Sequence, residues 1–150
     1  MTDSLATIPQ KIASSARKGA NPETRVIDGE DVDLPYGYNA RQGDAYIQRL
    51  PIDEVDVSGF APTTERQIAP GKTVGSRHVV TTADDSSRPA DIYDRGGNEL
   101  TGPVIVAPQG FYLSHPQHAD IDFRLPGAYL CTFPADEKAR ELGEIRRRMD

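Results

Sequence analysis

Short apolar segments separated by turn residues fill the middle of the chain, from Arg41 to Phe133. The segments DAYIQRL, RHVVTT, GFYLS and ADIDF are rich in β-branched and aromatic residues, which favour strands. Glycine, proline and aspartate recur between them at the short intervals that are typical of strands joined by tight turns. The pattern predicts a mainly β domain over residues 41–134, a small sandwich or barrel of the jelly-roll kind.

Two stretches of the sequence predict a hairpin and a buried strand within this domain. In ADIYDRGGNELTGPVIVA, two strand-like runs flank DRGGN, whose glycines supply the positive φ angles that a hairpin turn needs. In GAYLCTF, alternate residues fall on opposite faces of a strand, and both faces are mainly apolar. We therefore expect Tyr129, Leu130 and Cys131 to be buried in the core.

The pattern changes at both ends of the chain. Residues 1–40 are predicted to be an extended N-terminal arm, because they are mostly polar and acidic, with a short helix in PQKIASSARKG. Residues 135–150 are predicted to be a C-terminal α-helix that begins after Pro134. The apolar stripe of this helix would consist of Leu142, Ile145 and Met149, and it could pack on the β-domain or on a partner.

Composition limits the classes of function. The 150-residue chain is long enough for one domain. Its net charge of −6 disfavours nucleic acid as the main partner, since proteins that coat nucleic acid are usually basic. No segment has the length and hydropathy of a membrane span, so no membrane partner is expected. The N-terminus lacks the pattern of a secretory signal.

The three histidines are the strongest candidates for chemistry. His115 and His118 lie in SHPQH, where Pro116 prevents a regular helix, and His78 lies beside a predicted strand. Three imidazoles suit an open catalytic site for a divalent transition metal such as zinc, with Asp120 or Asp122 in support. The alternative is a structural role, in which the rings bond to backbone or carboxylate groups without converging on one ion.

Other chemistry has weaker support in the sequence. Cys131 has no nearby histidine and is expected to be a buried thiol, while Ser114 beside His115 lacks the glycines of a nucleophile elbow. The GKT at Gly71 lacks the upstream glycine of a phosphate-binding loop, which favours an ordinary turn.

Four short motifs together resemble a family of small proteins from tailed bacteriophages and bacterial genomes. The motifs are QGDAYI from Gln42, GKTVGSRH from Gly71, HPQHADI from His115 and LPGAY from Leu125. They resemble the family patterns QGD before a strand, G-x-x-x-G-H-x-H, H-x-x-H-A and L-P-x-G-x-Y. The resemblance covers residues 41–133 and implies a phage-type context, but it brings no activity with it.

This chain departs from the family patterns at two places. Ser76 stands where the family has the first histidine of H-x-H, and LPGAY lacks one residue between its proline and glycine. The first departure removes one ligand from any metal site carried over from the family. Cupins also pair an H-x-H with a later histidine, but the glutamate of the cupin motif is missing after His78.

We therefore expect a non-enzymatic structural protein of a tailed-phage virion, such as a capsid-decorating or head–tail protein. Its arm and terminal helix would grip neighbouring protein subunits, it would need no cofactor, and it would be assembled in the host cytoplasm. One alternative is a metal-binding, cupin-like β-barrel of the bacterial cytoplasm, with or without enzymatic activity, that uses His78, His115 and His118. Another is a small regulatory or adaptor domain.

Overall fold

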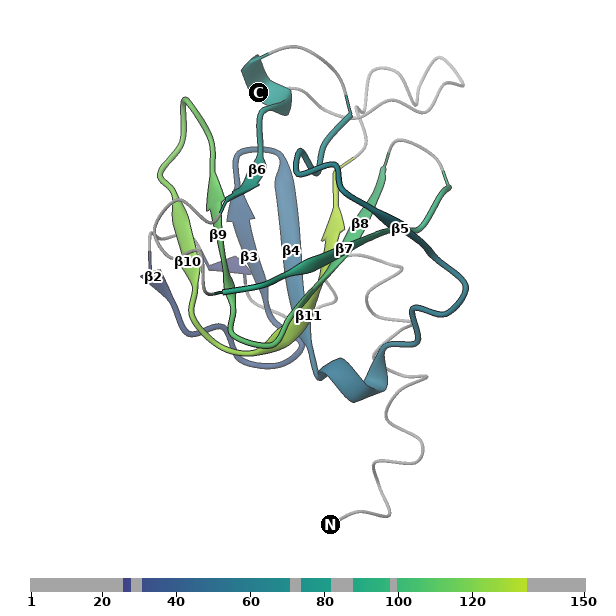
Figure 1. Ribbon diagram of the computed structural model, residues 1–150. Helices are drawn as coiled ribbons and strands as arrows, with labels where there is room; N and C mark the ends of the chain where they lie inside the picture. Colours follow the sequence, from purple (N-terminus) through teal and green to yellow (C-terminus); the bar gives the residue numbers. More distant parts are fainter. Residues whose placement is uncertain (1–25, 28–30, 71–73, 82–87, 98–99, 135–150) are drawn as a thin grey trace.

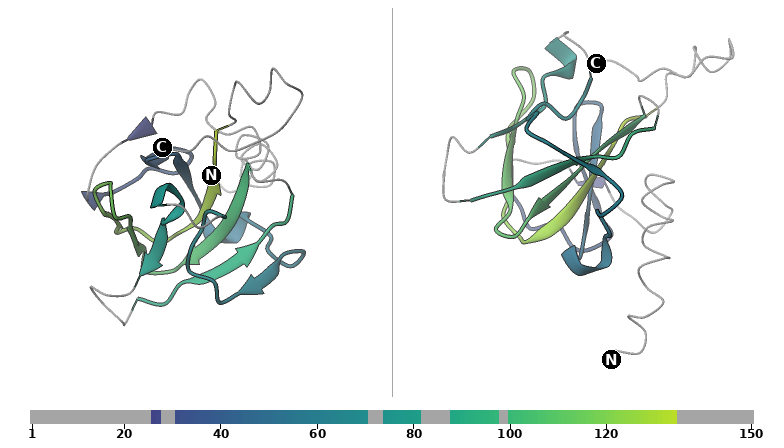
Figure 2. Two further views of the ribbon diagram at one scale, coloured as in Figure 1. Left: turned by 90° about the horizontal axis from the view of Figure 1, so that it is seen from above. Right: turned by 45° about the vertical axis from the view of Figure 1, so that its right-hand side comes forward.

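The computed structural model describes residues 26–27, 31–70, 74–81, 88–97 and 100–134, and these residues form two β-sheets packed face to face (Figures 1 and 2). The mainly β sandwich expected from the sequence is confirmed. The expected helices at residues 9–19 and 135–150 lie outside the described residues, as do Gly71–Thr73.

The larger layer, sheet A, has the strand order β1-β3-β4-β11-β8-β7-β5, and the smaller layer, sheet B, has the order β2-β10-β9-β6. The strands of sheet A are β1 (Val26–Ile27), β3 (Asn39–Gln42), β4 (Ala45–Leu50), β5 (Ala61–Thr63), β7 (Asp91–Asp94), β8 (Thr101–Ala107) and β11 (Gly127–Thr132). The strands of sheet B are β2 (Asp31–Val32), β6 (Val79–Thr81), β9 (Phe111–Ser114) and β10 (Ile121–Phe123). Among the described residues, two short 3-10 helices, η2 (Ile52–Glu54) and η3 (Val74–Ser76), lie in the connections.

Each predicted apolar segment of the middle region contains a strand. DAYIQRL contains β4, RHVVTT contains β6, and GFYLS, ADIDF and GAYLCTF contain β9, β10 and β11. The predicted hairpin is also confirmed, since β7 and β8 pair antiparallel and Gly96 and Gly97 in the turn have φ angles of 72° and 87°. These angles are open to glycine at little cost.

The sandwich begins earlier in the chain than the expected boundary at residue 40. In β1, Ile27 pairs parallel with Ala40 of β3, and in β2, Val32 pairs parallel with Phe123 of β10. Val32 and Leu34 are buried in the core between the sheets. The described part of the expected arm, residues 26–27 and 31–40, is therefore part of the β-domain.

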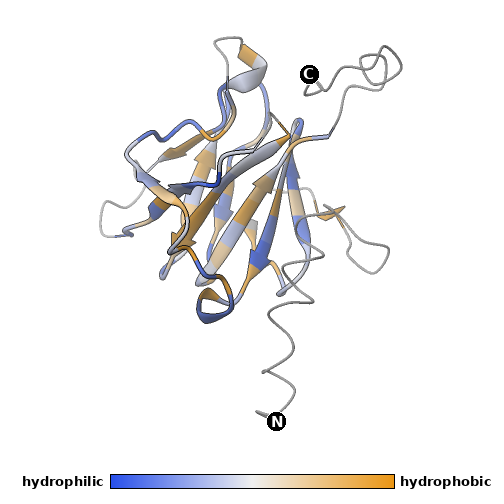
Figure 3. Cartoon of the chain, turned by 90° about the vertical axis from the view of Figure 1, so that its right-hand side faces the viewer, coloured by the Kyte–Doolittle hydropathy of each residue, from blue (hydrophilic) through white to orange (hydrophobic). Residues whose placement is uncertain are grey.

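The core has two parts, one on each face of sheet A. The main part lies between the sheets and contains Tyr129 and Cys131, which are fully buried as expected. The smaller part lies on the outer face of sheet A, where the loop after β4 covers the strands. Its buried members are Leu50, Val104, Ala128 and Leu130, packed against Val55, Val57, Phe60 and Val106. Hydrophobic and hydrophilic positions are mixed along the strands in Figure 3.

We predict that Leu130→Ala lowers the free energy of unfolding by about 2–5 kcal/mol, because it leaves a cavity in the outer part of the core. The control is Val74→Ala, since the Val74 side chain is 49% exposed and its truncation leaves no buried cavity. Chemical denaturation of both variants measures the difference. Equal stability of the two variants would contradict the assignment of this second core.

Candidate functional site

The histidines meet because of the register between β6 and β9. These strands pair antiparallel with Val79 opposite Ser114, so the next position along the ladder places His78 beside His115. The two ring centroids lie 4.4 Å apart and the rings are tilted by 47°. The turn after β9 then brings the His118 ring to 4.6 Å from the His115 ring. The structure thus brings together all three histidines that the sequence selected.

His78 is fully buried, and both of its ring nitrogens contact side chains from the turn between β3 and β4. Nδ1 lies 2.8 Å from Oε1 of Gln42, and Nε2 lies 2.9 Å from Oδ1 of Asp44. Gly43, between these two residues, has a φ angle of 56° and allows the turn to present both side chains to the ring. The histidine of sheet B is therefore tied to sheet A at two points.

The amide of Gln42 determines where the protons lie. Its Nε2 donates to the carbonyl oxygens of Leu113, at 3.1 Å, and Ala119, at 2.9 Å, so its Oε1 faces His78. Because Oε1 can only accept, Nδ1 of His78 carries a proton. The remaining contact, between Nε2 of His78 and the carboxyl group of Asp44, then holds one further proton. The pair is either an imidazolium with a carboxylate or a neutral imidazole with a carboxylic acid. Neither ring nitrogen offers a lone pair to a ligand in this arrangement.

His115 is held as the neutral tautomer that is protonated at Nε2. Its Nδ1 accepts a hydrogen bond from the backbone N–H of Gln117 at 3.0 Å, so this nitrogen carries no proton. Its Nε2 then donates to the carbonyl oxygen of Gly75 in η3, at 3.3 Å. The ring connects the turn after β9 to the short helix before β6, and only 6% of the residue is exposed.

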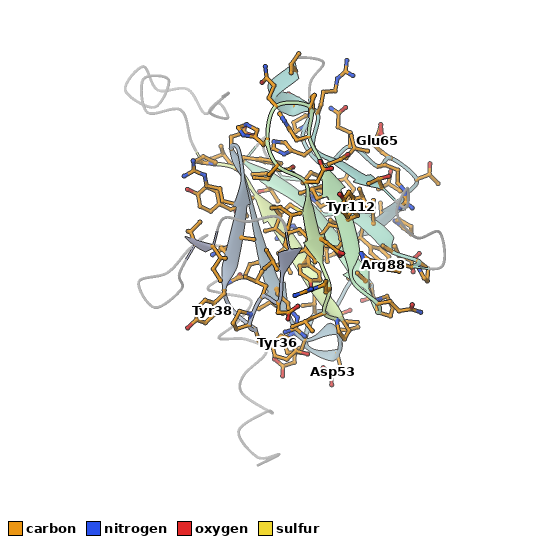
Figure 4. The ribbon with its side chains drawn as sticks, turned by 90° about the vertical axis from the view of Figure 1, so that its left-hand side faces the viewer. Tyr36, Tyr38, Asp53, Glu65, Arg88 and Tyr112 are labelled. Atoms are coloured by element: carbon orange, nitrogen blue, oxygen red, sulfur yellow. The ribbon has the colours of Figure 1, made fainter. Side chains whose placement is uncertain are left out.

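The two carboxylates proposed to support a metal bind other groups. Asp120 accepts a hydrogen bond from the Tyr112 hydroxyl at 3.1 Å, and Asp122 lies 2.8 Å from Arg88 in an ion pair. Tyr112 and Arg88 lie on the outer side of sheet B, which faces the viewer in Figure 4. Within the part of the chain that the structure describes, no group of three or more His, Cys, Asp or Glu side chains is placed to hold a metal ion.

Sequence reasoning missed Gln42 and Asp44 as partners of His78. They lie in QGDAYI, which the sequence singled out only as a motif of the phage family. The available signal was a pair of polar residues separated by one glycine. The pair lies between the end of one strand and the start of the next. This signal could not predict the contact with His78, because that contact depends on the packing of sheet A on sheet B. No local sequence pattern predicts this packing.

Cys131 lies in the main core, away from the histidines in sequence. It is fully buried, and this burial raises the pKa of its thiol to about 12, while the nearby Arg95 acts in the opposite direction. The thiolate is the reactive form of cysteine, so a thiol with this pKa is a poor nucleophile. This geometry supports packing as the role of Cys131.

We predict that Gln42→Ala lowers the free energy of unfolding by about 3 kcal/mol, since a buried group left without a partner costs about 1–3 kcal/mol. Gln67→Ala is the matched control, because the half-buried Gln67 amide donates to the nearby Ala69 carbonyl. That variant should lose only about 1 kcal/mol. Similar losses in the two variants, measured by denaturant titration, would show that Gln42 does not tie the sheets.

We predict that Cys131 reacts with an aromatic disulfide reagent at neutral pH only as fast as the protein unfolds. Burial in the folded state raises the pKa of this thiol above its ordinary value of 9.0. Above that pH the unfolded chain loses the thiol proton while the folded chain keeps it, so the free energy of unfolding should fall as the pH rises beyond 9.0. Absorbance at the start of the reaction measures labelling, and protein in denaturant is the positive control. Rapid stoichiometric labelling of the native protein would contradict the buried position.

No protein-family model, curated protein or solved structure matches this chain in the comparisons with known proteins. In the described residues, no helix is both long enough and apolar enough to cross a membrane. The function is therefore inferred from the residues and the geometry of the chain itself.

Proposed function

We propose that this protein is a non-enzymatic structural subunit of a tailed-phage virion, either a capsid-decorating or a head–tail protein, assembled in the host cytoplasm. The observation that carries the proposal is that both ring nitrogens of His78 bond to Gln42 and Asp44 inside the sandwich. The residue best suited to chemistry thus serves to join the two sheets. The phage-type motifs of the sequence supply the context of a particle.

A structural subunit needs a body that keeps its shape while its ends bind neighbours. Buried polar groups with all their hydrogen bonds satisfied make a core rigid, because each bond fixes one relative position of its partners. Gln42, His78 and His115 meet this requirement by linking sheet A, sheet B and η3. In the proposed role, this jelly-roll-like body presents its N-terminal arm and C-terminal helix to other protein subunits.

A second candidate is a metal-binding, cupin-like protein that uses His78, His115 and His118 with a divalent transition metal such as zinc. The proximity of the three rings, with centroid separations of 4.4 Å and 4.6 Å, favours it. Metal binding would require His78 to turn away from Gln42 or Asp44, since a ligand nitrogen must present its lone pair. A metal would therefore compete with the bonds that join the sheets.

The structural proposal predicts that the chain is a regular component of purified phage particles, at a fixed number of copies per particle. Quantitative mass spectrometry of gradient-purified virions measures this number. Deleting residues 1–25 should leave the described β-domain folded, because its strands and core begin later, and should abolish incorporation. If the chain is missing from intact particles, the proposal is wrong.

Metal analysis separates the second candidate from the first. We expect less than about 0.1 zinc per chain after gentle purification, and no change in melting temperature when a chelator is added. The comparison variant is His118→Ala, which removes one potential ligand while leaving His78 with its two partners. Zinc at one per chain, lost in His118→Ala, would establish the metal site and overturn the structural reading of the histidines.

A further inference from the structure

The two ends of the sandwich differ in the side chains that they expose. Strand β4 runs from the turn between β3 and β4 to η2, so these two features mark opposite ends of the domain. Figure 1 shows η2 below the sheets and η3 above them. We call the end with η2 and the turn at residues 35–37 the acidic end, and the end with η3 and the β3–β4 turn the basic end.

Three carboxylates gather at and just after η2 in the acidic end. Asp53 and Asp56 are exposed, and Glu54 lies beside Asp53 in the helix. Burial and then the charge of Asp53 raise the pKa of Glu54, whereas a hydrogen bond from the Ser58 backbone N–H lowers the pKa of Asp56. None of the three forms an ion pair in the part of the chain that the structure describes. The acidic end thus presents negative charge that no ion pair compensates.

An exposed aromatic ring lies at the same end. Tyr36 is 51% exposed, and Figure 4 shows it at the end of the sandwich that also holds Asp53. The guanidinium of Arg49 lies 3.8 Å from the centre of the Tyr36 ring, and hydrogen bonds to backbone carbonyl oxygens hold this guanidinium in place. The ring is therefore positioned before a partner arrives, which lowers the entropic cost of binding. Ile52, 36% exposed, adds apolar surface.

The basic end exposes side chains of complementary chemistry. Arg41 and Arg77 are exposed, and within the described residues neither forms an ion pair. They directly precede Gln42 and His78, whose side chains bond to each other, so both arginines lie at this end. Val74 of η3 is 49% exposed and supplies apolar surface. The basic end thus offers two unpaired cations and an apolar side chain.

We propose that copies of this chain associate end to end, with the acidic end of one copy against the basic end of the next. The acidic end suits a partner with exposed cations and apolar surface, and the chain itself carries both at its opposite end. One rigid sandwich cannot bring its own two ends together, so the partner is a second copy. Contact between two like ends would oppose charges of the same sign, which is unfavourable.

A contact between two different surfaces repeats from copy to copy and generates a ring or a filament. This inference rests on the proposed function and names a second copy as one neighbour of each subunit in the particle. The two surfaces are small, so the purified chain should associate at high protein concentration and low ionic strength, and added salt should weaken the association.

The first experiment reverses the charge at one end at a time. Asp53→Arg places a positive charge opposite Arg77, and Arg77→Asp places a negative charge opposite Asp53. In either variant every end-to-end contact opposes like charges, so the association constant should fall at least about tenfold. Sedimentation equilibrium at low ionic strength measures this constant. The control is Asp91→Arg, since Asp91 is exposed on β7, three strands from β4 in sheet A. This variant should change the constant by less than about threefold.

The second experiment combines both reversals in one chain. In the double variant Asp53→Arg/Arg77→Asp, the two ends again carry opposite signs, so the association constant should return to within about threefold of the wild-type value. Contact between two acidic ends, or between two basic ends, would not recover, because both surfaces in such a contact would keep charges of one sign. The double variant therefore distinguishes an end-to-end contact from a symmetric one.

The third experiment removes the aromatic ring. Tyr36→Ala should lower the association constant at least about tenfold, because a positioned aromatic side chain typically contributes much of the binding energy of an interface. Val26→Ala is the matched control, since Val26 is a 41% exposed apolar residue at the β1 edge of sheet A. A similar loss in the two variants would contradict a contact centred on Tyr36.

A wild-type chain that stays monomeric at high concentration and low ionic strength would overturn the end-to-end contact. A double variant that associates as weakly as the two single variants would also overturn it. All three experiments use the purified full chain, whereas the count of copies in virions tests the proposed function. The two ideas can therefore fail separately.

Discussion

The hydrogen bonds of His78 to Gln42 and Asp44 fix how the two sheets face each other. They join the turn between β3 and β4 in sheet A to the start of β6 in sheet B. A buried polar group without partners is costly, so a shift of one sheet against the other would leave these three side chains unsatisfied. Apolar contacts tolerate small displacements, whereas this set of bonds selects one alignment.

At the other end of β4, Arg49 also joins separate segments of the chain by buried hydrogen bonds. Its guanidinium is buried and donates to the carbonyl oxygens of Leu34 and Pro126, which belong to two different loops. The strand thus has a polar connection at each end, and the fully buried Ala45 and Ile47 lie between them on the face that meets the main core. In this arrangement the apolar core supplies most of the stabilising burial, and the polar groups at its two ends set the positions of the chain segments around it.

Local patterns predicted the strands well because each strand carries its signal in consecutive residues. The alternation in GAYLCTF predicted the two faces of β11, and the glycines of DRGGN predicted the hairpin. The histidine cluster was predictable only in part. His115 and His118 are close in sequence, but their contact with His78 depends on the register of β6 and β9. The start of the sandwich was missed because its signal is short, with Val32 and Leu34 alternating with aspartates in an otherwise polar stretch.

The position of β11 in the centre of sheet A has a consequence for the order of folding. During synthesis β4 emerges long before β11, and its ladder with β11, from Ala128 opposite Leu50 to Thr132 opposite Tyr46, cannot form until nearly the whole described domain is available. A fold whose central pairing joins distant parts of the chain has a high contact order, which slows folding. Until β11 arrives, β4 and β8 present open apolar edges, so the nascent domain is most exposed to aggregation just before it is complete.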